Sequence, residues 1–172
     1  MNTKEVGQLI LMGITGTTVD SETADIIKLV QPGGIILFGR NIESPIQLRQ
    51  LIEDIRNLSN NEPIITIDQE GGRVSRLRLI GNEPPSAMEL TSTNDLKLIA
   101  QHGKLTGMIL RQYGFNLNLC PVLDITSLND NTNSLRGRCY GSDPNQVISN
   151  CLLYTSDAAD DSLRVDLGGR RI

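Results

Sequence analysis

Short apolar runs alternate with longer amphipathic stretches over the first 150 residues of the chain. The hydrophobic residues of each run follow one another almost without interruption, which is typical of strands buried on both faces of a parallel sheet. Four such strands are predicted, at residues 9–14, 34–38, 64–68 and within 116–124. Because amphipathic stretches separate them, the pattern predicts successive βα units.

The amphipathic stretch after Ser44 is predicted to form a helix with a defined start. Ser44 is a typical N-cap residue, Pro45 suits the first helical position, and Gln47 would complete a capping box. The apolar residues after it keep helical spacing, so one face of this helix is expected to pack on the core. These residues are Leu48, Leu51, Ile52, Ile55 and Leu58. A weaker pattern predicts a helix over residues 21–30.

A third helix is predicted from about Asn94 to Tyr113, and Gly114 suits its C-terminal end. Gly103 and Gly107 remove side chains, so we expect them to let this helix lie close to the sheet. Its core-facing residues are expected to be Leu98, Leu105, Ile109 and Tyr113.

Four βα units in a chain of 172 residues restrict the fold to two α/β architectures. A complete (β/α)8 barrel needs about 250 residues, so one candidate is the first half of a TIM barrel, an incomplete barrel. The other candidate is a small open sheet, which has the same periodicity. Residues 1–150 are expected to form this α/β domain, and periodicity alone does not decide between the two.

Residues 151–172 differ in character from the rest of the chain. The stretch from Cys151 to Asp161 resembles the translation of a transposase-type sequencing-library adapter, and the residues up to Ile172 fit further adapter sequence. We therefore predict a non-biological tail over 151–172 and exclude it from fold prediction. An acidic, disordered C-terminal tail is the alternative.

Composition excludes several classes of partner. The net charge of −4 and the pI near 5.0 leave no basic stripe, so no nucleic-acid partner is expected. Three cysteines without C-x-x-C spacing fit reduced thiols in a cytosol. No signal peptide and no apolar run of membrane-spanning length are found, so no membrane span and a cytoplasmic location are expected.

The richest chemistry follows the third predicted strand, where Asp68 and Glu70 lie two residues apart. Strand ends are where α/β proteins place ligand-binding groups. In an extended chain the two carboxylates would point the same way, with Cα atoms roughly 6–7 Å apart, and paired carboxylates are typical of glycosidases. The alternative is structural: Asp68 accepts backbone N–H groups, and Glu70 pairs with Arg73 or Arg76.

The residues around these carboxylates favour a functional interpretation. Gly71 and Gly72 allow a tight loop and the close approach of a ligand. Arg73 and Arg76 add planar groups with several donors, which suit polar substrates.

A second polar loop follows the fourth predicted strand and should lie at the same edge of the sheet. It contains Arg136, Arg138 and Asp143. Arginines in loops often have no role beyond contact with solvent. Because two polar loops are expected at one edge of the sheet, a functional role for these arginines is an alternative of similar weight. Asp124, which is expected to end the fourth strand, is predicted to support the site by holding a loop.

Other candidate sites are weak. His102 is the only histidine and falls on a predicted helix, so we expect an ordinary packed histidine. Gly13 and Gly16 only faintly suggest a dinucleotide loop, because the full Gly-x-Gly-x-x-Gly pattern is absent. Metal-ligand spacings are also absent. No metal and no cofactor are predicted.

The segment Asp68-Gln-Glu-Gly-Gly-Arg-Val-Ser-Arg76 resembles the signature of family 3 glycoside hydrolases of the β-N-acetylglucosaminidase type. Three further segments match that family pattern in order. They are Gly33-Gly-Ile-Ile-Leu-Phe-Gly-Arg-Asn41, Asn116-Leu-Asn-Leu-Cys-Pro-Val-Leu-Asp124 and Arg138-Cys-Tyr-Gly-Ser-Asp-Pro144. The resemblance extends from about Val6 to Asn150.

The resemblance implies a (β/α)8 barrel that removes terminal β-linked N-acetylglucosamine with retention of configuration. Bacterial members of the family act on muropeptides during peptidoglycan recycling. The positions that match Asp68, Arg76 and Arg138 bind the terminal sugar in the family. Glu70 then becomes a supporting group, together with Arg73 and Asp124, and the idea of an Asp68/Glu70 catalytic pair is displaced.

The chain departs from the family pattern in one respect. A Lys-His-Phe-Pro-Gly-His-like segment with a histidine acid/base, and later an aspartate nucleophile, belong to the pattern but do not occur in the 172 residues. No catalytic residue is therefore predicted, and the chain itself is expected to be inactive. Two alternatives remain. One is a β-glucosidase of the same family, against which the Asp-Gln-Glu-Gly-Gly-Arg form argues, and the other is a non-enzymatic α/β binding module.

Overall fold

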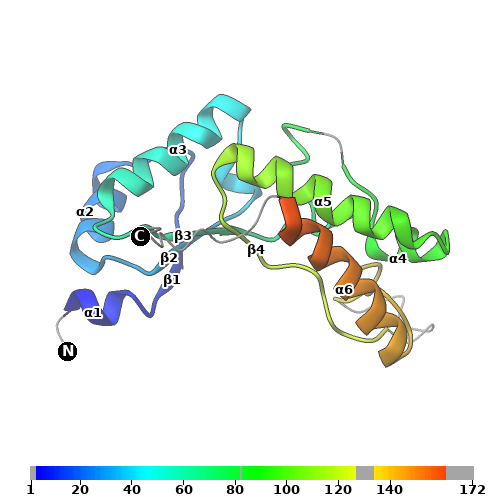
Figure 1. Ribbon diagram of the computed structural model, residues 1–172. Helices are drawn as coiled ribbons and strands as arrows, with labels where there is room; N and C mark the ends of the chain where they lie inside the picture. Colours follow the sequence, from blue (N-terminus) through cyan, green and yellow to red (C-terminus); the bar gives the residue numbers. More distant parts are fainter. Residues whose placement is uncertain (1–2, 82, 127–133, 162–172) are drawn as a thin grey trace. The chain divides into compact units, whose positions relative to one another are not determined.

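The computed structural model describes residues 3–81, 83–126 and 134–161, which divide into two compact units (Figure 1). We call them the sheet unit and the helical unit and describe each by itself. The sheet unit comprises Met1–Asp68, Arg76–Asn82 and Gln112–Leu119. The helical unit comprises Gln69–Ser75, Glu83–Arg111 and Cys120–Ile172.

Four parallel strands make up the sheet: β1 (Leu11–Gly13), β2 (Gly34–Leu37), β3 (Ile64–Ile67) and β4 (Leu117–Asn118). Their order in the sheet is β1-β2-β3-β4, the same as their order in the chain. A doubly wound open sheet reverses its strand order at a switch point, whereas a (β/α)8 barrel adds each strand beside the previous one. The order therefore favours the barrel, of which the described residues form an incomplete part, and the predicted fold class is confirmed.

Helices cover one face of this sheet. The sheet unit contains α1 (Thr3–Gly7), α2 (Ser21–Val30), the 3-10 helix η1 (Gly39–Asn41) and α3 (Pro45–Leu58). Figure 1 shows α2 and α3 along the same side of the strands. The side chains of that side are fully buried, namely Ile35, Leu37, Ile65 and Ile67 from the strands and Leu48, Leu51, Ile52 and Ile55 from α3. The predicted apolar face of α3 is thus confirmed for these four residues.

The opposite face of the sheet is partly open. Leu11 and Ile64 flank Gly34 in one row of the register, and Leu117 pairs with Thr66 on the same face. Leu11, Ile64 and Leu117 are each more than a third exposed. In a closed barrel, inward-pointing side chains of other strands cover this face.

The start of α3 holds two neighbouring loops together, although the predicted capping box does not form. The Ser44 hydroxyl accepts a hydrogen bond from the Gln47 backbone N–H at 3.2 Å. The Gln47 side chain, however, accepts from Glu43 N at 2.8 Å and donates to the carbonyls of Thr17 and Asn41. Gln47 thereby ties the loop after β1 to the loop after β2.

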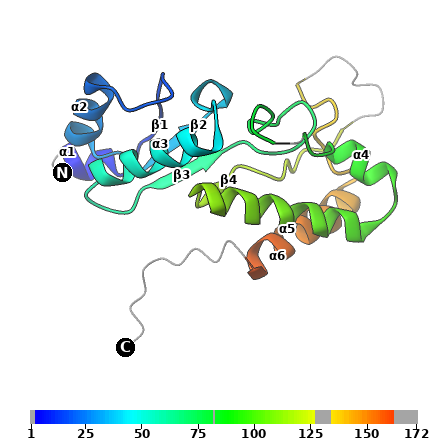
Figure 2. The ribbon, with the colours of Figure 1, turned by 90° about the horizontal axis from the view of Figure 1, so that it is seen from above.

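The helical unit contains α4 (Ala87–Ser92), most of α5 (Leu96–Tyr113) and α6 (Pro144–Asp161). Figure 2 shows α5 and α6 alongside each other. A Cβ on Gly103 of α5 would meet the Tyr154 carbonyl oxygen at 2.1 Å, so the two backbones are in contact there. The core of this unit is formed by Ala87, Leu90, Ile99, Tyr140, Val147, Cys151 and Tyr154.

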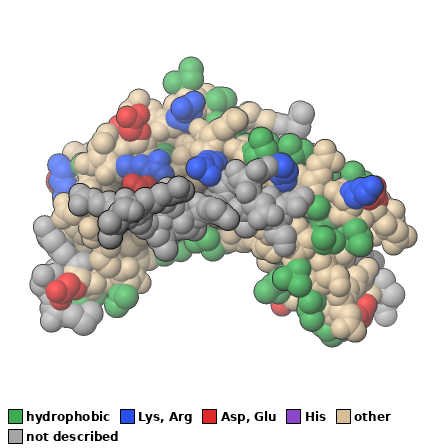
Figure 3. Space-filling view, in the orientation of Figure 1, with side chains coloured by type: hydrophobic (Ala, Val, Ile, Leu, Met, Phe, Trp, Pro, Cys, Tyr) green, Lys and Arg blue, Asp and Glu red, His purple; other side chains and the backbone are tan. Residues whose placement is uncertain are grey.

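The predicted core face of α5 is wrong. Leu98, Leu105 and Ile109 are each more than a third exposed, and Figure 3 shows hydrophobic side chains at the surface over α5 and α6. The buried face contains Ile99, His102, Gly103, Thr106, Gly107 and Leu110 instead. At Gly103 the close neighbour is α6 and not the sheet, as had been expected from the sequence. Only a residue without a side chain allows the two helix backbones to come this close.

Helix α6 continues through the predicted domain boundary at residue 150. Asn150 is buried and donates to the Tyr140 carbonyl at 2.8 Å. Cys151 and Tyr154, one and four residues further on, are also buried, and their spacing of three residues places them on one helix face. A non-biological tail over 151–172 stays a prediction, but positions 151 and 154 face the core in this structure.

Candidate functional site

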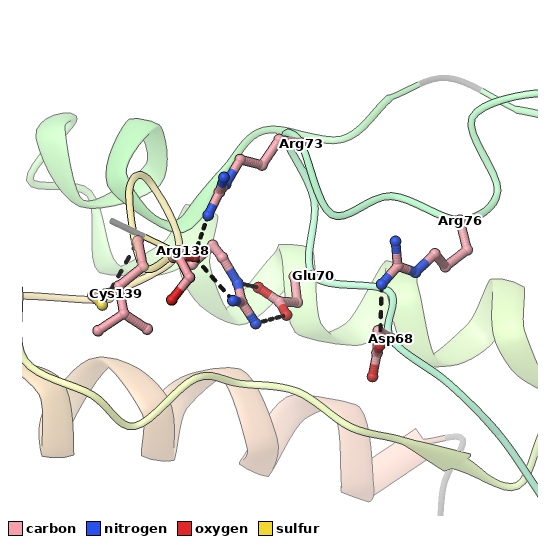
Figure 4. A network of polar contacts seen from close by, with 8 residues as sticks. Asp68, Glu70, Arg73, Arg76, Arg138 and Cys139 are labelled. Carbon is pink, nitrogen blue, oxygen red and sulfur yellow. Dashed lines mark hydrogen bonds and ion pairs between the residues drawn. The ribbon is translucent and has the colours of Figure 1, made fainter. Parts of the chain in front are cut away.

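Asp68 directly follows β3, the strand between β2 and β4, as expected for a residue at the carboxyl edge of a parallel sheet. Arg76 Nη2 donates to Asp68 Oδ2 at 3.1 Å (Figure 4). About a quarter of the Asp68 side chain is exposed. Among the described residues, Asp68 Oδ1 has no hydrogen-bond partner. Arg76 therefore orients a carboxylate that can still accept hydrogen bonds from a ligand.

Two arginines share the Phe38 ring in the same unit. The guanidinium carbon of Arg40 lies 4.6 Å from the ring centroid, and that of Arg76 lies 5.7 Å from it. Both distances fall within the range of a cation–π interaction. Phe38 therefore links Arg40 to the Asp68–Arg76 pair.

In the helical unit, Glu70 and Arg138 form a two-point ion pair (Figure 4). Arg138 Nε donates to Glu70 Oε2 at 2.8 Å, and Nη2 donates to Oε1 at 2.7 Å. The remaining terminal nitrogen, Nη1, donates to the Ser134 carbonyl at 3.1 Å. The Glu70 side chain is only 7% exposed. This arrangement joins the loop after β3 to the loop that contains residue 138.

Two glycines fold the segment after Glu70 into a tight turn. Gly71 and Gly72 have φ of +102° and +52°, which side chains disfavour. A Cβ on Gly71 would lie 2.2 Å from the Pro85 carbonyl oxygen. The backbone N–H of Glu70 and that of Gly71 both donate to the Val74 carbonyl. The expectation of a tight loop is confirmed, and its close neighbour is the chain itself.

The sequence of the chain matches a family model, Glycosyl hydrolase family 3 N terminal domain, over residues 1–156. The match covers most of both units. The chain belongs to glycosyl hydrolase family 3.

Curated relatives agree with this family membership. A β-hexosaminidase of Tolumonas auensis is 34% identical over 141 residues, which is 81% of this chain and 41% of that protein. The β-hexosaminidase LpqI of Mycobacterium tuberculosis is 31% identical over 157 residues, 91% of this chain and 39% of that protein. The chain thus spans well under half the length of either relative.

Solved family 3 structures have the same fold. NagZ from Neisseria gonorrhoeae, in complex with N-trifluoroacetyl-D-glucosamine, superposes with a TM-score of 0.79 at 26% identity, covering 87% of this chain and 46% of that one. A family 3 β-N-acetylglucosaminidase from Paenibacillus sp. gives 0.81 at 30% identity, covering 93% and 31%.

The other predicted site residues of this family 3 chain have structural partners or lie at the surface. Arg73 is exposed and donates to the Ser134 carbonyl. Arg136 is exposed. Asp143 accepts from the backbone N–H groups of Asn145 and Gln146 at the start of α6, so it caps that helix. The structural alternative for Glu70 is wrong in its partner, which is Arg138 and not Arg73 or Arg76.

The prediction that Asp124 ends the fourth strand is wrong. β4 stops at Asn118, and Val122 makes only an isolated bridge with Cys139. Pro121 has no N–H for a ladder hydrogen bond, which is a physical reason for the early end. Asp124 is exposed and close enough to Cys139 to add to the rise in the pKa of that thiol, which burial mainly causes. A supporting role for Asp124 stays a prediction.

His102 and the thiols are packed groups. His102 is buried, its ring lies edge-on to Tyr154 at 5.6 Å, and burial lowers its pKa. Burial raises the pKa of Cys120 to about 12 and that of Cys151 to about 11, which keeps both protonated.

Within the part of the chain that the structure describes, no three His, Cys, Asp or Glu side chains gather to hold a metal ion. None of the helices there is long and apolar enough to cross a membrane.

Phe38 and Arg40 are not among the predicted site residues, although they belong to a segment on which the family resemblance rests. The rule that pointed to Asp68 applies to them too, since Phe38 directly follows β2 and Arg40 lies two residues further on in η1. The stacking of Arg40 on Phe38 has no signature in the sequence.

Proposed function

We propose that this chain carries part of the sugar-binding site of a retaining β-N-acetylhexosaminidase that removes terminal β-linked N-acetylglucosamine. Asp68 would accept hydrogen bonds from sugar hydroxyls, and Arg76 would hold Asp68 in place. Arg138 is included in the proposal as the third sugar-binding position of the family pattern. The histidine acid/base and the aspartate nucleophile that the family resemblance implies are not among the positions matched in these 172 residues, and we therefore propose that the chain binds the sugar without turning it over.

The observation that carries the proposal is the Asp68–Arg76 pair. A carboxylate accepts two hydroxyl hydrogen bonds well when a guanidinium fixes its orientation, because charge-assisted hydrogen bonds are short and directional. Asp68 keeps one oxygen without a partner among the described residues, and it follows the third of four parallel strands. Ligand sites of barrel enzymes lie at such strand ends.

Glu70 supports the site instead of reacting in it. Its carboxylate is buried and bound at both oxygens by Arg138. A carboxylate used in this way cannot also receive a proton or attack a sugar without breaking the ion pair. The arrangement supports the assignment of Glu70 as a residue that fixes the position of Arg138.

The substrate class and location belong to the same proposal. Relatives named β-hexosaminidases and the Neisseria structure with a glucosamine derivative support an N-acetylglucosaminide over a β-glucoside. We propose muropeptides derived from peptidoglycan as the natural substrates and the cytoplasm as the site of action.

Ligand-observed NMR titration of the 172-residue chain with N-acetylglucosamine tests the proposal. We expect weak saturable binding that falls about tenfold in Asp68→Asn, since the loss of a charge-assisted hydrogen bond weakens binding by about that factor. Asp25→Asn, at an exposed position of α2, is the matched control and should bind like the unchanged chain.

Two results would contradict parts of this proposal. Equal binding by the Asp68→Asn variant and the unchanged chain would exclude Asp68 as a sugar ligand. Release of a chromophore from a chromogenic β-N-acetylglucosaminide by the purified chain would show turnover, and the assignment of the chain as a binding fragment would then be wrong.

A further inference from the structure

His102 is buried in contact with two other segments of the helical unit. Its exposed fraction is 7%, and its ring lies edge-on to the Tyr154 ring of α6 at 5.6 Å. It also meets the turn after Glu70. A Cβ on Gly71 would lie 3.3 Å from His102 Cε1 and 2.2 Å from the Pro85 carbonyl oxygen. This second contact lies outside the predicted tail, so it does not depend on the tail sequence.

The turn that His102 contacts fixes the position of Glu70. The backbone N–H groups of Glu70 and Gly71 both donate to the Val74 carbonyl. Both carboxylate oxygens of Glu70 accept hydrogen bonds from Arg138. A chain of direct contacts therefore runs from His102 through the turn and Glu70 to Arg138, all within one unit.

His102 fits this place only as a neutral ring. Both ring nitrogens are buried, and neither has a hydrogen-bond partner among the described residues. A charged group without a partner is far more costly to bury than a neutral one. A proton on the ring has to be matched by an acceptor or by water, and the ring has to move to reach either. The Pro85 carbonyl oxygen is an acceptor beside the same turn, so this movement disturbs the turn.

Within the described part of the chain, no charged side chain offsets the cost of a protonated His102. Tyr154 faces the ring from α6 and stays neutral, because burial raises its pKa well above the ordinary value. The thiol of Cys120, which is hydrogen-bonded to Tyr154, is neutral for the same reason, with a pKa of about 12. The turn presents two glycines, and the residues one helical turn away on α5 are Leu, Ile and Thr. Burial alone lowers the pKa of His102, so neither Glu70 nor Arg138 opposes it.

We propose that His102 is a positioning residue for Arg138, and that protonation of its ring loosens the Gly71 turn and weakens sugar binding. The inference rests on the proposed function, in which Arg138 is one of the sugar-binding positions. It goes further by giving the site a dependence on pH that arises in the helical unit and not at Asp68. Sugar affinity should be highest when the ring is neutral and should fall as the solution becomes acidic.

Ligand-observed NMR titration with N-acetylglucosamine between pH 7.5 and pH 5.5 tests this, at pH values where circular dichroism shows the 172-residue chain to be folded. We expect Kd to rise about threefold or more over this range, because affinity falls with the fraction of chains in the competent state. The amide signals of Gly71 and Gly72 should shift with the same midpoint as the His102 Cε1 proton. The amide of Gly34, in the sheet unit, should not follow that midpoint.

Two variants that cannot take up a proton at this position complete the experiment. His102→Phe keeps a ring beside Tyr154 and removes the buried nitrogens, so it should bind the sugar as the unchanged chain does at pH 7.5 and keep that affinity at pH 5.5. His102→Gln should also lose the pH dependence, with weaker binding because it lacks the ring. Glu53→Gln, at an exposed position of α3, is the matched control and should keep the dependence.

The outcomes separate this proposal from the proposed function. Sugar binding that depends on Asp68 but is equal at pH 7.5 and pH 5.5 overturns the role of His102 and leaves the sugar site intact. An unchanged pH dependence in His102→Phe also overturns it, because another group then titrates. A shift of the His102 signal without one at Gly71 shows a histidine that is only packed, which again overturns it. If no sugar binds at any pH, the proposed function fails and the role of His102 fails with it.

Discussion

Asp68 and Glu70 are separated by one residue, yet each carboxylate has a different cation as its partner. Asp68 is bound by Arg76, eight residues away in the chain, and Glu70 by Arg138, 68 residues away. The chain is no longer extended after Ile67, because Gly71 and Gly72 turn it tightly. A buried ion pair with both oxygens bound is costly to break. Asp68, with an accessible oxygen, is the better ligand for a substrate.

His102 gives a prediction about pH. Both of its ring nitrogens are buried and lack a partner among the described residues, and burial lowers its pKa below the ordinary value of 6.5. The unfolded chain therefore binds more protons than the folded one between the folded pKa and 6.5, so stability falls as pH falls through this window. We expect urea midpoints of the chain to be lower at pH 5.5 than at pH 7.5.

The variant His102→Gln isolates this contribution. Its side chain does not titrate, so the difference in free energy of unfolding between the variant and the unchanged chain should shift with pH in favour of the variant as pH falls. Tyr154, the neighbouring ring, stays neutral throughout, because burial raises its pKa well above the ordinary value. Parallel pH profiles for the two proteins would mean that His102 is not the group responsible.

At the scale of the element, α5 shows how an amphipathic pattern can indicate the wrong face. The helix has large apolar residues on more than one side: Leu105 and Ile109 are nearly half exposed, whereas Ile99 and Leu110 are buried. The buried face also contains the small residues Gly103, Thr106 and Gly107. Close contact between two helices depends on backbone approach as well as on hydrophobicity, and the glycine at position 103 allows that approach.

Gly103→Ala is predicted to destabilise the chain by about 2 kcal/mol, in the range for overpacking of a close contact. The sign of this change in the free energy of unfolding is informative, because inside an unconstrained helix the same substitution would stabilise the chain by about 1 kcal/mol. Here the new Cβ would meet the Tyr154 carbonyl oxygen at 2.1 Å. Chemical denaturation followed by circular dichroism measures the change.

Gly81→Ala is the matched control for this substitution. Its Cβ would approach nothing closer than the Leu77 carbonyl oxygen at 3.8 Å, so the free energy of unfolding should stay within about 0.5 kcal/mol of the unchanged chain. A stabilising effect of Gly103→Ala would show that α5 and α6 are not in backbone contact in solution.

At the scale of the whole molecule, the sheet has helices on one face and half-exposed apolar side chains on the other. Leu11, Ile64 and Leu117 lie on that second face. Exposed apolar surface of this kind favours association. This chain spans less than half the length of its β-hexosaminidase relatives from Tolumonas auensis and Mycobacterium tuberculosis. In a complete (β/α)8 barrel, the side chains of the remaining strands would cover this face of the sheet.

Sequencing the parent locus through codon 150 tests the predicted tail. We expect the reading frame to continue into a Lys-His-Phe-Pro-Gly-His-like segment, with hydrophobic residues at positions 151 and 154 because both face the core of the helical unit. A genome that encodes Cys151 to Ile172 followed by a stop codon would contradict both the tail and the enzyme hypothesis for this gene product. A binding module would then be the better interpretation.

Much of the fold could be predicted from local pattern. Residues 21–30 form α2 as expected, the apolar face of α3 is buried, and all four strands lie within or at the predicted runs. These features depend on periodic burial and on caps such as Ser44, which are encoded within a few residues. The end of β3, which Asp68 directly follows, could be predicted for the same reason.

What remained undetermined depends on segments far apart in the chain. The sequence by itself determined a parallel α/β fold, a polar loop after the third strand and the family resemblance. Only the tertiary structure decided the strand order, the buried face of α5, the pairing of Glu70 with Arg138 and the stacking of Arg40 on Phe38. The physical reason is that a residue's pattern fixes its local conformation, whereas its partner is fixed by which distant backbone the turns bring alongside it.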